Sequence, residues 1–140
     1  MNTKQELLVV NLEVFEERYF AVPGGGQDEG ETLEYTVYRE LKEELGIERN
    51  SLEPVGMSST PIVFDFKSGP LSRDGIPYIG QEKYCFGFNF IGDENSIHPA
   101  DGEVRSFKWV QLTELHKYLL FENELEGVVE RVKEMFKIKV

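Results

Sequence analysis

Three glutamates at helical spacing could together bind a divalent cation. Residues 32–45 carry an apolar side chain at every fourth position, which predicts a helix with one buried stripe of Leu33, Val37, Leu41 and Leu45. Because successive helical residues turn by about 100°, Glu40, Glu43 and Glu44 share one arc of roughly 100°. Like charges at such spacings cost about 0.2–0.5 kcal/mol per pair, and a bound cation reverses this repulsion. The alternative is a solvated acidic face, relieved by basic neighbours such as Arg39.

A run of glycines directly precedes this helix. Pro23 is followed by Gly24, Gly25 and Gly26, which predicts a turn. Glycine lets the backbone pass close to a metal or a phosphate, where a side chain would obstruct the approach. Beyond the turn, Thr32 is the expected N-cap of the helix and Gly46 its expected C-terminal stop.

The remaining elements surround this loop and helix. Apolar and aromatic runs predict five strands, at residues 7–11, 18–22, 52–59, 83–91 and 104–110. We expect the strand at 83–91 to be broken at Gly87 and to share a sheet with 104–110. Glycine, proline and polar residues predict a long loop at 65–81, and apolar residues at helical spacing predict a terminal helix over 122–137.

Size and composition limit the classes of function. A chain of 140 residues that is 40% hydrophobic suits one folded domain, so we expect residues 1–140 to form a single unit. The net charge of −11 argues against a long nucleic acid as partner, because polyanions repel each other. Cys85 is the only cysteine, which excludes an intrachain disulfide and a thiolate zinc site and favours a reducing cytoplasm. The apolar run at 7–10 is too short to span a membrane, so no membrane association is expected.

The glycine loop and the acidic helix together resemble the Nudix box. Gly25, five residues, Glu31, seven residues, then Arg39-Glu-Leu-Lys-Glu-Glu-Leu-Gly-Ile47 meet every fixed position of that motif over 23 residues. The chain is therefore identified as a member of the Nudix (MutT-like) family. The resemblance implies an α+β fold, an α/β/α sandwich with a mixed sheet that carries a loop–helix–loop motif. It also implies a pyrophosphohydrolase that uses Mg²⁺, with Mn²⁺ as a substitute, on a small nucleotide-type substrate.

The resemblance also implies roles for individual residues. Glu43 and Glu44 would ligate Mg²⁺, and Glu40 would be either a further ligand or the base that acts on water. In the family, a glutamate before a later strand completes the metal site, and Glu103 matches it here. The other implied parts are the backbone carbonyl of Gly24 as an additional ligand, Gly25 and Glu31 as supporting residues, and Arg39 as the group that holds a catalytic glutamate in place.

Substrate contacts carry weaker signals. The segment from Gly80 is similar to a Gly-Gln strand of the RNA pyrophosphohydrolase and dinucleoside polyphosphate hydrolase branch, whereas the acidic segment 120–125 departs from that branch and argues against capped or triphosphorylated RNA. We expect substrate contacts from aromatic or basic side chains at Phe64, Tyr78, Lys83 and Arg73. Each of these residues could equally serve the core or the surface.

Two further expectations concern assembly and activity. Only 24 residues precede Gly25, fewer than family members usually have, so one strand could be missing or short and its exposed edge could pair in a homodimer. The rival to an enzyme is a non-catalytic Nudix-fold nucleotide sensor. Such proteins often lose glutamates of the box, and this chain retains all of them.

Overall fold

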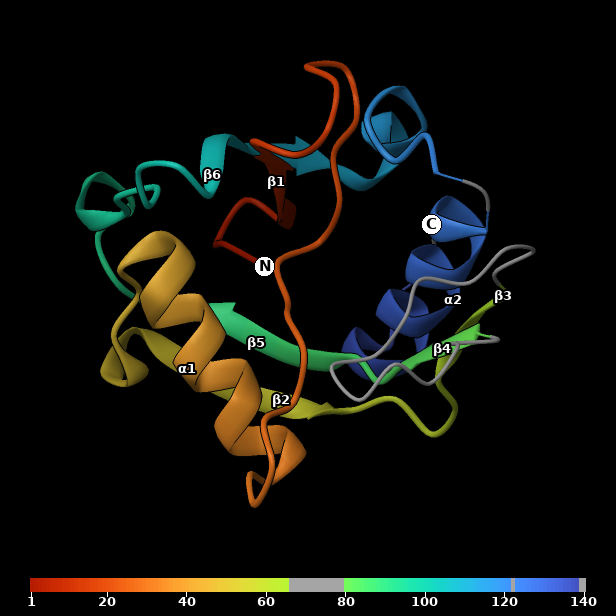
Figure 1. Ribbon diagram of the computed structural model, residues 1–140. Helices are drawn as coiled ribbons and strands as arrows, with labels where there is room; N and C mark the ends of the chain where they lie inside the picture. Colours follow the sequence, from red (N-terminus) through yellow and green to blue (C-terminus); the bar gives the residue numbers. More distant parts are fainter. Residues whose placement is uncertain (66–79, 122, 139–140) are drawn as a thin grey trace.

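The computed structural model describes residues 1–65, 80–121 and 123–138. Within these residues, two helices and six strands are joined by three short 3₁₀ helices (Figure 1). The helices are α1 (Leu33–Leu45) and α2 (Glu124–Phe136), and the strands are β1 (Glu6–Leu12), β2 (Leu52–Met57), β3 (Ile62–Asp65), β4 (Gly80–Lys83), β5 (Phe86–Phe90) and β6 (Val104–Gln111). The 3₁₀ helices are Arg49–Ser51, Glu94–Ser96 and Leu112–Lys117. None of the helices in the described ranges is long and apolar enough to cross a bilayer.

Strand β1 lies at the centre of the core and is buried on both faces. Alternate side chains of a strand point to opposite sides, so Leu8 and Val10 pack in one apolar cluster with α1 and β5. Val9 points the other way, into a second cluster with α2 and the segment after β6. This double burial explains why β1 is a continuous apolar run rather than an alternating one. Figure 1 shows α1 and α2 on opposite sides of the molecule, with β5 running between them.

Helix α1 has the boundaries that its sequence predicts. The Thr32 side chain accepts a hydrogen bond from the Tyr35 N–H, and Gly46 ends the helix in the left-handed conformation at φ 66°. The helix buries Leu41 and Leu45 against the core and packs Val37 beside them. Leu33 is 37% exposed, so the predicted buried stripe is wrong in the first turn of the helix. The predictions for β1, β2, β6 and α2 are also confirmed to within a few residues.

Two predicted strands differ from the structure. Residues 18–22 make a single bridge to β1, between Val10 and Ala21. The ladder does not extend because the Tyr19 N–H donates to the Glu16 carbonyl and Pro23 has no N–H to donate. The predicted strand 83–91 is interrupted at Tyr84 and Cys85, not at Gly87. The reason is that both backbone groups of Cys85 bond to Ser58, its carbonyl to the Ser58 N–H and its N–H to the Ser58 Oγ.

The strands form three antiparallel pairs: β1 with β6, β2 with β5, and β3 with β4. The prediction that 83–91 and 104–110 share a sheet is therefore wrong, because β5 hydrogen-bonds to β2 and β6 to β1. Strand β3 was not predicted. The parallel component of the expected mixed sheet is not among the strand pairs of the described residues. Most of the predicted loop 65–81 lies outside them.

Candidate active site

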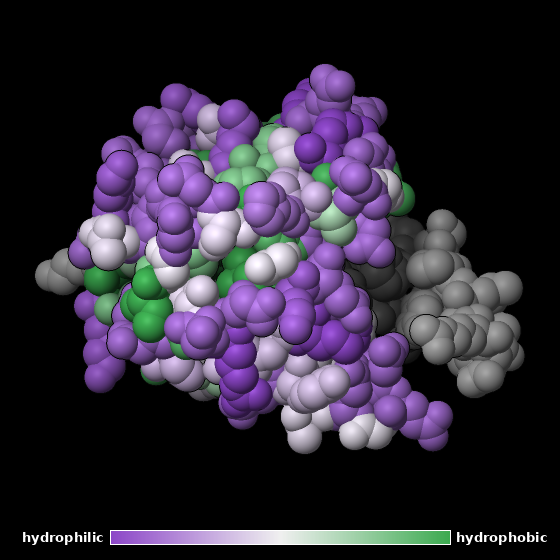
Figure 2. All heavy atoms as spheres, turned by 90° about the vertical axis from the view of Figure 1, so that its left-hand side faces the viewer, coloured by the Kyte–Doolittle hydropathy of each residue, from purple (hydrophilic) through white to green (hydrophobic). Residues whose placement is uncertain are grey.

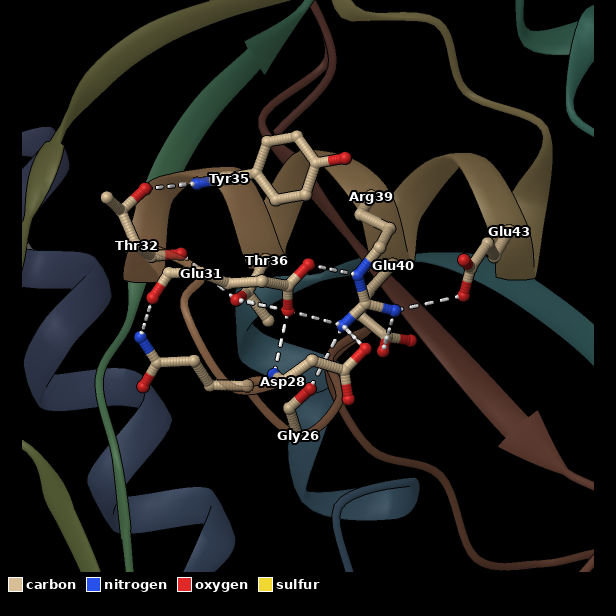
Figure 3. Close-up of polar contacts among 10 residues, drawn as sticks. Gly26, Asp28, Glu31, Thr32, Tyr35, Thr36, Arg39, Glu40 and Glu43 are labelled. Carbon is tan, nitrogen blue, oxygen red and sulfur yellow. Dashed lines mark hydrogen bonds and ion pairs between the residues drawn. The ribbon is translucent and has the colours of Figure 1, made fainter.

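Arg39 joins the glycine loop to helix α1 (Figure 3). Its Nε and Nη2 donate to the two carboxylate oxygens of Glu31, at 2.7 and 2.9 Å. Its Nη1 donates to Glu40 at 2.9 Å and to Glu43 at 3.1 Å, and its Nη2 also reaches the Gly26 carbonyl at 3.1 Å. One planar guanidinium thus fixes groups from both elements in a single arrangement.

Glu31 holds that guanidinium from the loop side. Its carboxylate also accepts hydrogen bonds from the Asp28 N–H at 2.8 Å and from the Thr36 hydroxyl at 3.1 Å. The hydrogen bond from Arg39 is the largest cause that lowers the pKa of Glu31 to about 2, from an ordinary 4.5. Glu31 therefore stays ionised at neutral pH and keeps Arg39 in position.

Gly25 packs directly against the carboxyl group of Glu40. A Cβ atom at position 25 would lie 2.3 Å from the Glu40 Cδ and 2.5 Å from each carboxylate oxygen. The Glu40 side chain is only 15% exposed, so it is held between this backbone and Arg39. Position 25 requires a glycine because the Glu40 carboxyl group lies so close to its backbone. A Cβ atom at position 24 or 26 would have no atom within 4 Å.

Glu44 is a buried carboxyl group beside other carboxylates. Burial, followed by the charge of Glu40, raises the pKa of Glu44 to about 8. Glu40 also hydrogen-bonds to Glu44, and the charge of Glu103 raises this pKa further. A hydrogen bond with the Gly24 backbone acts in the opposite direction. Glu40, Glu44 and Glu103 thus share one electrostatic environment next to Gly24.

Backbone hydrogen bonds bring Glu103 to this place. The N–H groups of His98 and Ala100 donate to the carbonyls of Leu45 and Glu44, both at 2.8 Å, at the C-terminal end of α1. The Ala100 carbonyl in turn accepts from the N–H groups of Glu103 and Val104, at 3.2 and 3.0 Å. The residues after Ile97 therefore tie the end of α1 to the start of β6.

The three glutamates of α1 do not all point the same way, in contrast to the expectation of one shared acidic face. Glu43 is 56% exposed and its carboxylate turns to Arg39, whereas only 8% of Glu44 is exposed. No three acidic, histidine or cysteine side chains in the described ranges converge closely enough to hold a metal ion as they stand. The carboxyl groups stay apart because like charges repel each other and because Arg39 donates hydrogen bonds to Glu40 and Glu43.

A cavity of about 490 Å³ opens beside the glycine loop. It extends from Gly24 and Gly25, past α1 and β5, to one face of α2. Its polar lining side chains include Thr36, Lys83 and Arg131, while most of the others are apolar or aromatic. Figure 2, which faces the side of the molecule that carries α1, shows apolar atoms between hydrophilic ones near the middle of that face.

Of the four expected substrate contacts, only Lys83 is placed at this cavity. The backbone of Phe64 belongs to β3. Tyr78 and Arg73 lie outside the described residues. The expectation missed Arg131, which lines the cavity from α2. Its signal in the sequence is a lone basic residue on the apolar face of that helix, beside Val128 and Val132.

The comparison with known proteins identifies the family. The model of the NUDIX domain matches residues 1–132. This chain belongs to the NUDIX domain family. It is 32% identical over 114 residues to an RNA pyrophosphohydrolase of Sphingopyxis alaskensis, with 78% of this chain and 72% of that protein aligned. It is 34% identical over 97 residues to an RNA pyrophosphohydrolase of Caulobacter vibrioides. That alignment covers 66% of this chain but only 55% of the relative.

Solved structures of Nudix proteins share the fold. The binary complex of the C. elegans Ap4A hydrolase matches with a TM-score of 0.71 at 16% identity, over 95% of this chain and 88% of that one. The E. coli dihydroneopterin triphosphate pyrophosphohydrolase matches with a TM-score of 0.69 at 14% identity, over 97% of this Nudix chain and 89% of that one. The predicted family, α+β fold class and enzyme class, a Nudix pyrophosphohydrolase, are confirmed.

Proposed function

We propose that this Nudix chain is a Mg²⁺-dependent hydrolase that cleaves a phosphoanhydride bond in a nucleoside polyphosphate or nucleoside diphosphate-linked substrate by attack of water. One observation carries the proposal. Glu44 is buried beside Glu40, Glu103 and the Gly24 backbone, and this burial, together with the negative charge that gathers here, raises its pKa to about 8. A divalent cation offsets such a concentration, and carboxylate oxygens are the ligands that Mg²⁺ prefers.

The residues present fit that cation. Glu44 and Glu103 would hold it, together with the Gly24 carbonyl, and Glu43 would join them on giving up its hydrogen bond to Arg39, while Glu40 would act as the base on water. Mn²⁺ has a similar preference for oxygen ligands and would substitute. When bound, the metal supplies charge neutralisation for the phosphates and a water of lowered pKa.

The protein groups have distinct tasks in this proposal. Arg39 holds Oε1 of Glu40, and Gly25 leaves the space in which the Glu40 carboxyl group lies. Glu40, fixed in this way, accepts the proton of the attacking water at Oε2. Glu31 keeps Arg39 in place through two hydrogen bonds. Glu31 therefore positions Arg39, and Arg39 positions the Glu40 carboxyl group that acts on the reacting water.

The charge of the protein favours a small substrate. A net charge of −11 disfavours a long polyanion, because parts of the polyanion that lie against the protein outside the site meet charges of the same sign. The relatives are named as an RNA pyrophosphohydrolase and an Ap4A hydrolase, and a pyrophosphate linkage is a phosphoanhydride. We propose that the substrate is a short nucleotide of this kind, that residues 1–140 act as one domain, and that the lone cysteine reflects a cytoplasmic protein.

A substrate panel tests this function. The protein is incubated with nucleoside triphosphates, dinucleoside polyphosphates, nucleoside diphosphate sugars and 5′-triphosphorylated oligonucleotides, each with Mg²⁺, with Mn²⁺ and with chelator, and the products locate the broken bond. We expect turnover of at least one small nucleotide that stops with chelator. Absence of turnover on every substrate would favour the nucleotide sensor instead.

Charge-removing variants test the metal assignment. Glu44→Gln and Glu43→Gln each remove a carboxyl group that could ligate the metal, at nearly constant volume, so we expect most turnover to be lost in both. Glu34→Gln, on an exposed part of the same helix, is the matched control and should keep its rate. The heat of Mg²⁺ binding should fall in Glu44→Gln and stay unchanged in Glu34→Gln. A wild-type rate in either Glu43→Gln or Glu44→Gln would refute the assignment.

A further inference from the structure

An irregular loop after β1 contributes an aromatic ring to the wall of the cavity. Residues 13–19 form neither a helix nor a strand, and Figure 1 shows them projecting beyond the β1–β6 pair. Phe15 of this loop lines the same cavity as Gly24 and Gly25. The Glu13 N–H donates to the Glu103 carbonyl at 2.9 Å, so the loop begins beside a proposed metal ligand.

A buried amide holds the second half of the loop. Asn11 is only 1% exposed, and its side-chain nitrogen donates to the carbonyls of Glu16 and Tyr19, at 2.9 and 2.6 Å. Backbone groups of an irregular loop have few partners in a strand ladder or a helix, so bonds of this kind decide where the loop lies.

Arg105 holds the half of the loop that carries Phe15. Its Nη2 donates to the Glu13 carbonyl and its Nη1 to the Phe15 carbonyl, both at 3.2 Å. The same Nη1 donates to the Asn11 Oδ1 at 2.5 Å, which connects the two side chains that support the loop. Arg105 belongs to β6, which is paired with β1 along its length. One guanidinium thus fixes the backbone of Phe15 relative to the sheet.

The Phe15 ring is also supported from outside the cavity. It packs edge-on against Phe121, with ring centroids 4.8 Å apart, and Tyr19 packs against the same ring at 4.8 Å. Phe121 and Tyr19 are not part of the cavity lining. Phe15 itself is only partly buried, so this support leaves ring surface that a ligand can cover.

The cavity has the size and lining of a site for a planar ligand. Its volume of about 490 Å³ falls within the range of small-molecule sites, roughly 300–1,000 Å³. Most of its lining side chains are apolar or aromatic. An aromatic side chain can stack on any nucleic-acid base, because every base has a π-face.

We propose that Phe15 stacks on the base of the nucleotide and that Arg105 is a positioning residue, which holds the loop so that the ring meets the base. The inference rests on the proposed function for the class of ligand, a nucleotide. The shared cavity lining connects the base site to the glycine loop, and the bond from Glu13 to Glu103 connects it to the acidic site.

Nucleosides measure the base contact without phosphates, so neither the metal nor hydrolysis is needed. Adenosine, guanosine, cytidine and uridine are titrated into the protein by NMR, with ribose as the control that has no base. Stacking of a base on an aromatic side chain is worth roughly 5- to 150-fold in affinity, so Phe15→Leu should weaken the best nucleoside by about tenfold. Tyr19→Leu removes a ring from the same aromatic cluster but not from the cavity, so its affinity should match the wild type.

Variants of Arg105 test the positioning role. Arg105→Gln releases the carbonyls of Glu13 and Phe15, so it should weaken the same nucleoside, and Arg105→Lys, which keeps a charged donor, should restore part of the loss. Arg18→Gln is the matched control, because it removes the same charge from an exposed side chain of the same loop. With the best substrate of the panel, Phe15→Leu and Arg105→Gln should raise KM and leave kcat nearly unchanged, because stacking is equal in the ground and transition states.

Several results would overturn the inference. They are binding of no nucleoside above the level of ribose, wild-type affinity in Phe15→Leu, or wild-type affinity in Arg105→Gln. If circular dichroism shows that Phe15→Leu is unfolded, nuclear Overhauser contacts between the nucleoside and the Phe15 ring of the wild type decide. Nucleoside binding that depends on Phe15, without any hydrolysis, would remove the proposed function and leave this base site. Hydrolysis with an unchanged KM in Phe15→Leu would remove the base site and leave the function.

Discussion

Replacing Gly25 with alanine tests whether the position of Glu40 controls turnover. The added methyl group would lie 2.3 Å from the Glu40 Cδ, while ordinary contacts begin near 3.4 Å, so the carboxyl group must retreat by about 1.1 Å. Gly25 is not among the glycines with positive φ, so alanine strains the side-chain contact and not the backbone. A misplacement of about 1 Å in a reacting group costs roughly a hundred-fold in rate. We expect kcat to fall by about that factor, measured on the best substrate of the panel.

The control for this change is Gly26→Ala. It adds the same methyl group one residue later, where no atom lies within 4 Å and φ is not positive. We expect its kcat to stay within about threefold of the wild type, and both variants to melt within a few degrees of it. A Gly25→Ala enzyme with the rate of Gly26→Ala would show that the exact place of Glu40 does not limit the reaction.

Three further changes probe the same network. Arg39→Lys keeps the charge but loses the planar fork, so kcat should fall about 10- to 100-fold with little change in circular dichroism; an unaffected rate would exclude a positioning role for the fork. Glu31 has its pKa lowered from 4.5 to about 2, so its stabilisation is complete above pH 4.5 and lost as pH falls towards 2. Urea midpoints of wild type and Glu31→Gln should therefore converge below pH 4.5, and a gap that is independent of pH would contradict this. Thr32→Ala removes the cap bond to the Tyr35 N–H and should lower the free energy of unfolding by about 1 kcal/mol, whereas no loss in urea titration would mean the cap is dispensable.

Local sequence predicted the part of the site that local interactions build. Glu31, Arg39 and Glu40 are close to one another in the sequence, in the loop and in α1. Their spacing alone therefore places these side chains together. The family motif also pointed to Glu103, although the hydrogen bonds through Ala100 that bring it close could not be read from the sequence. These bonds join residues that are far apart in the chain.

The features that sequence missed depend on tertiary contacts. Helical spacing places Glu43 and Glu44 at the two ends of one arc of about 100°. It does not show that Arg39 draws one outward and that the core buries the other. The break before β5 arises from hydrogen bonds to Ser58, and no pattern within residues 83–91 encodes it. Arg105 lies in a predicted strand like any exposed basic residue, and only its hydrogen bonds to the loop after β1 distinguish it.

The Ala100 N–H donates to the Glu44 carbonyl and the Ala100 carbonyl accepts from the Glu103 N–H, so a single residue links the backbones of two proposed ligands. The loops that join the strands between Gly46 and Ile97 can therefore gain or lose residues without changing this link. An insertion between His98 and Glu103 would change it directly. Changes in length between Gly46 and Ile97 can therefore alter which substrates are accepted while the reaction stays the same. Engineered insertions should be placed there and not between His98 and Glu103.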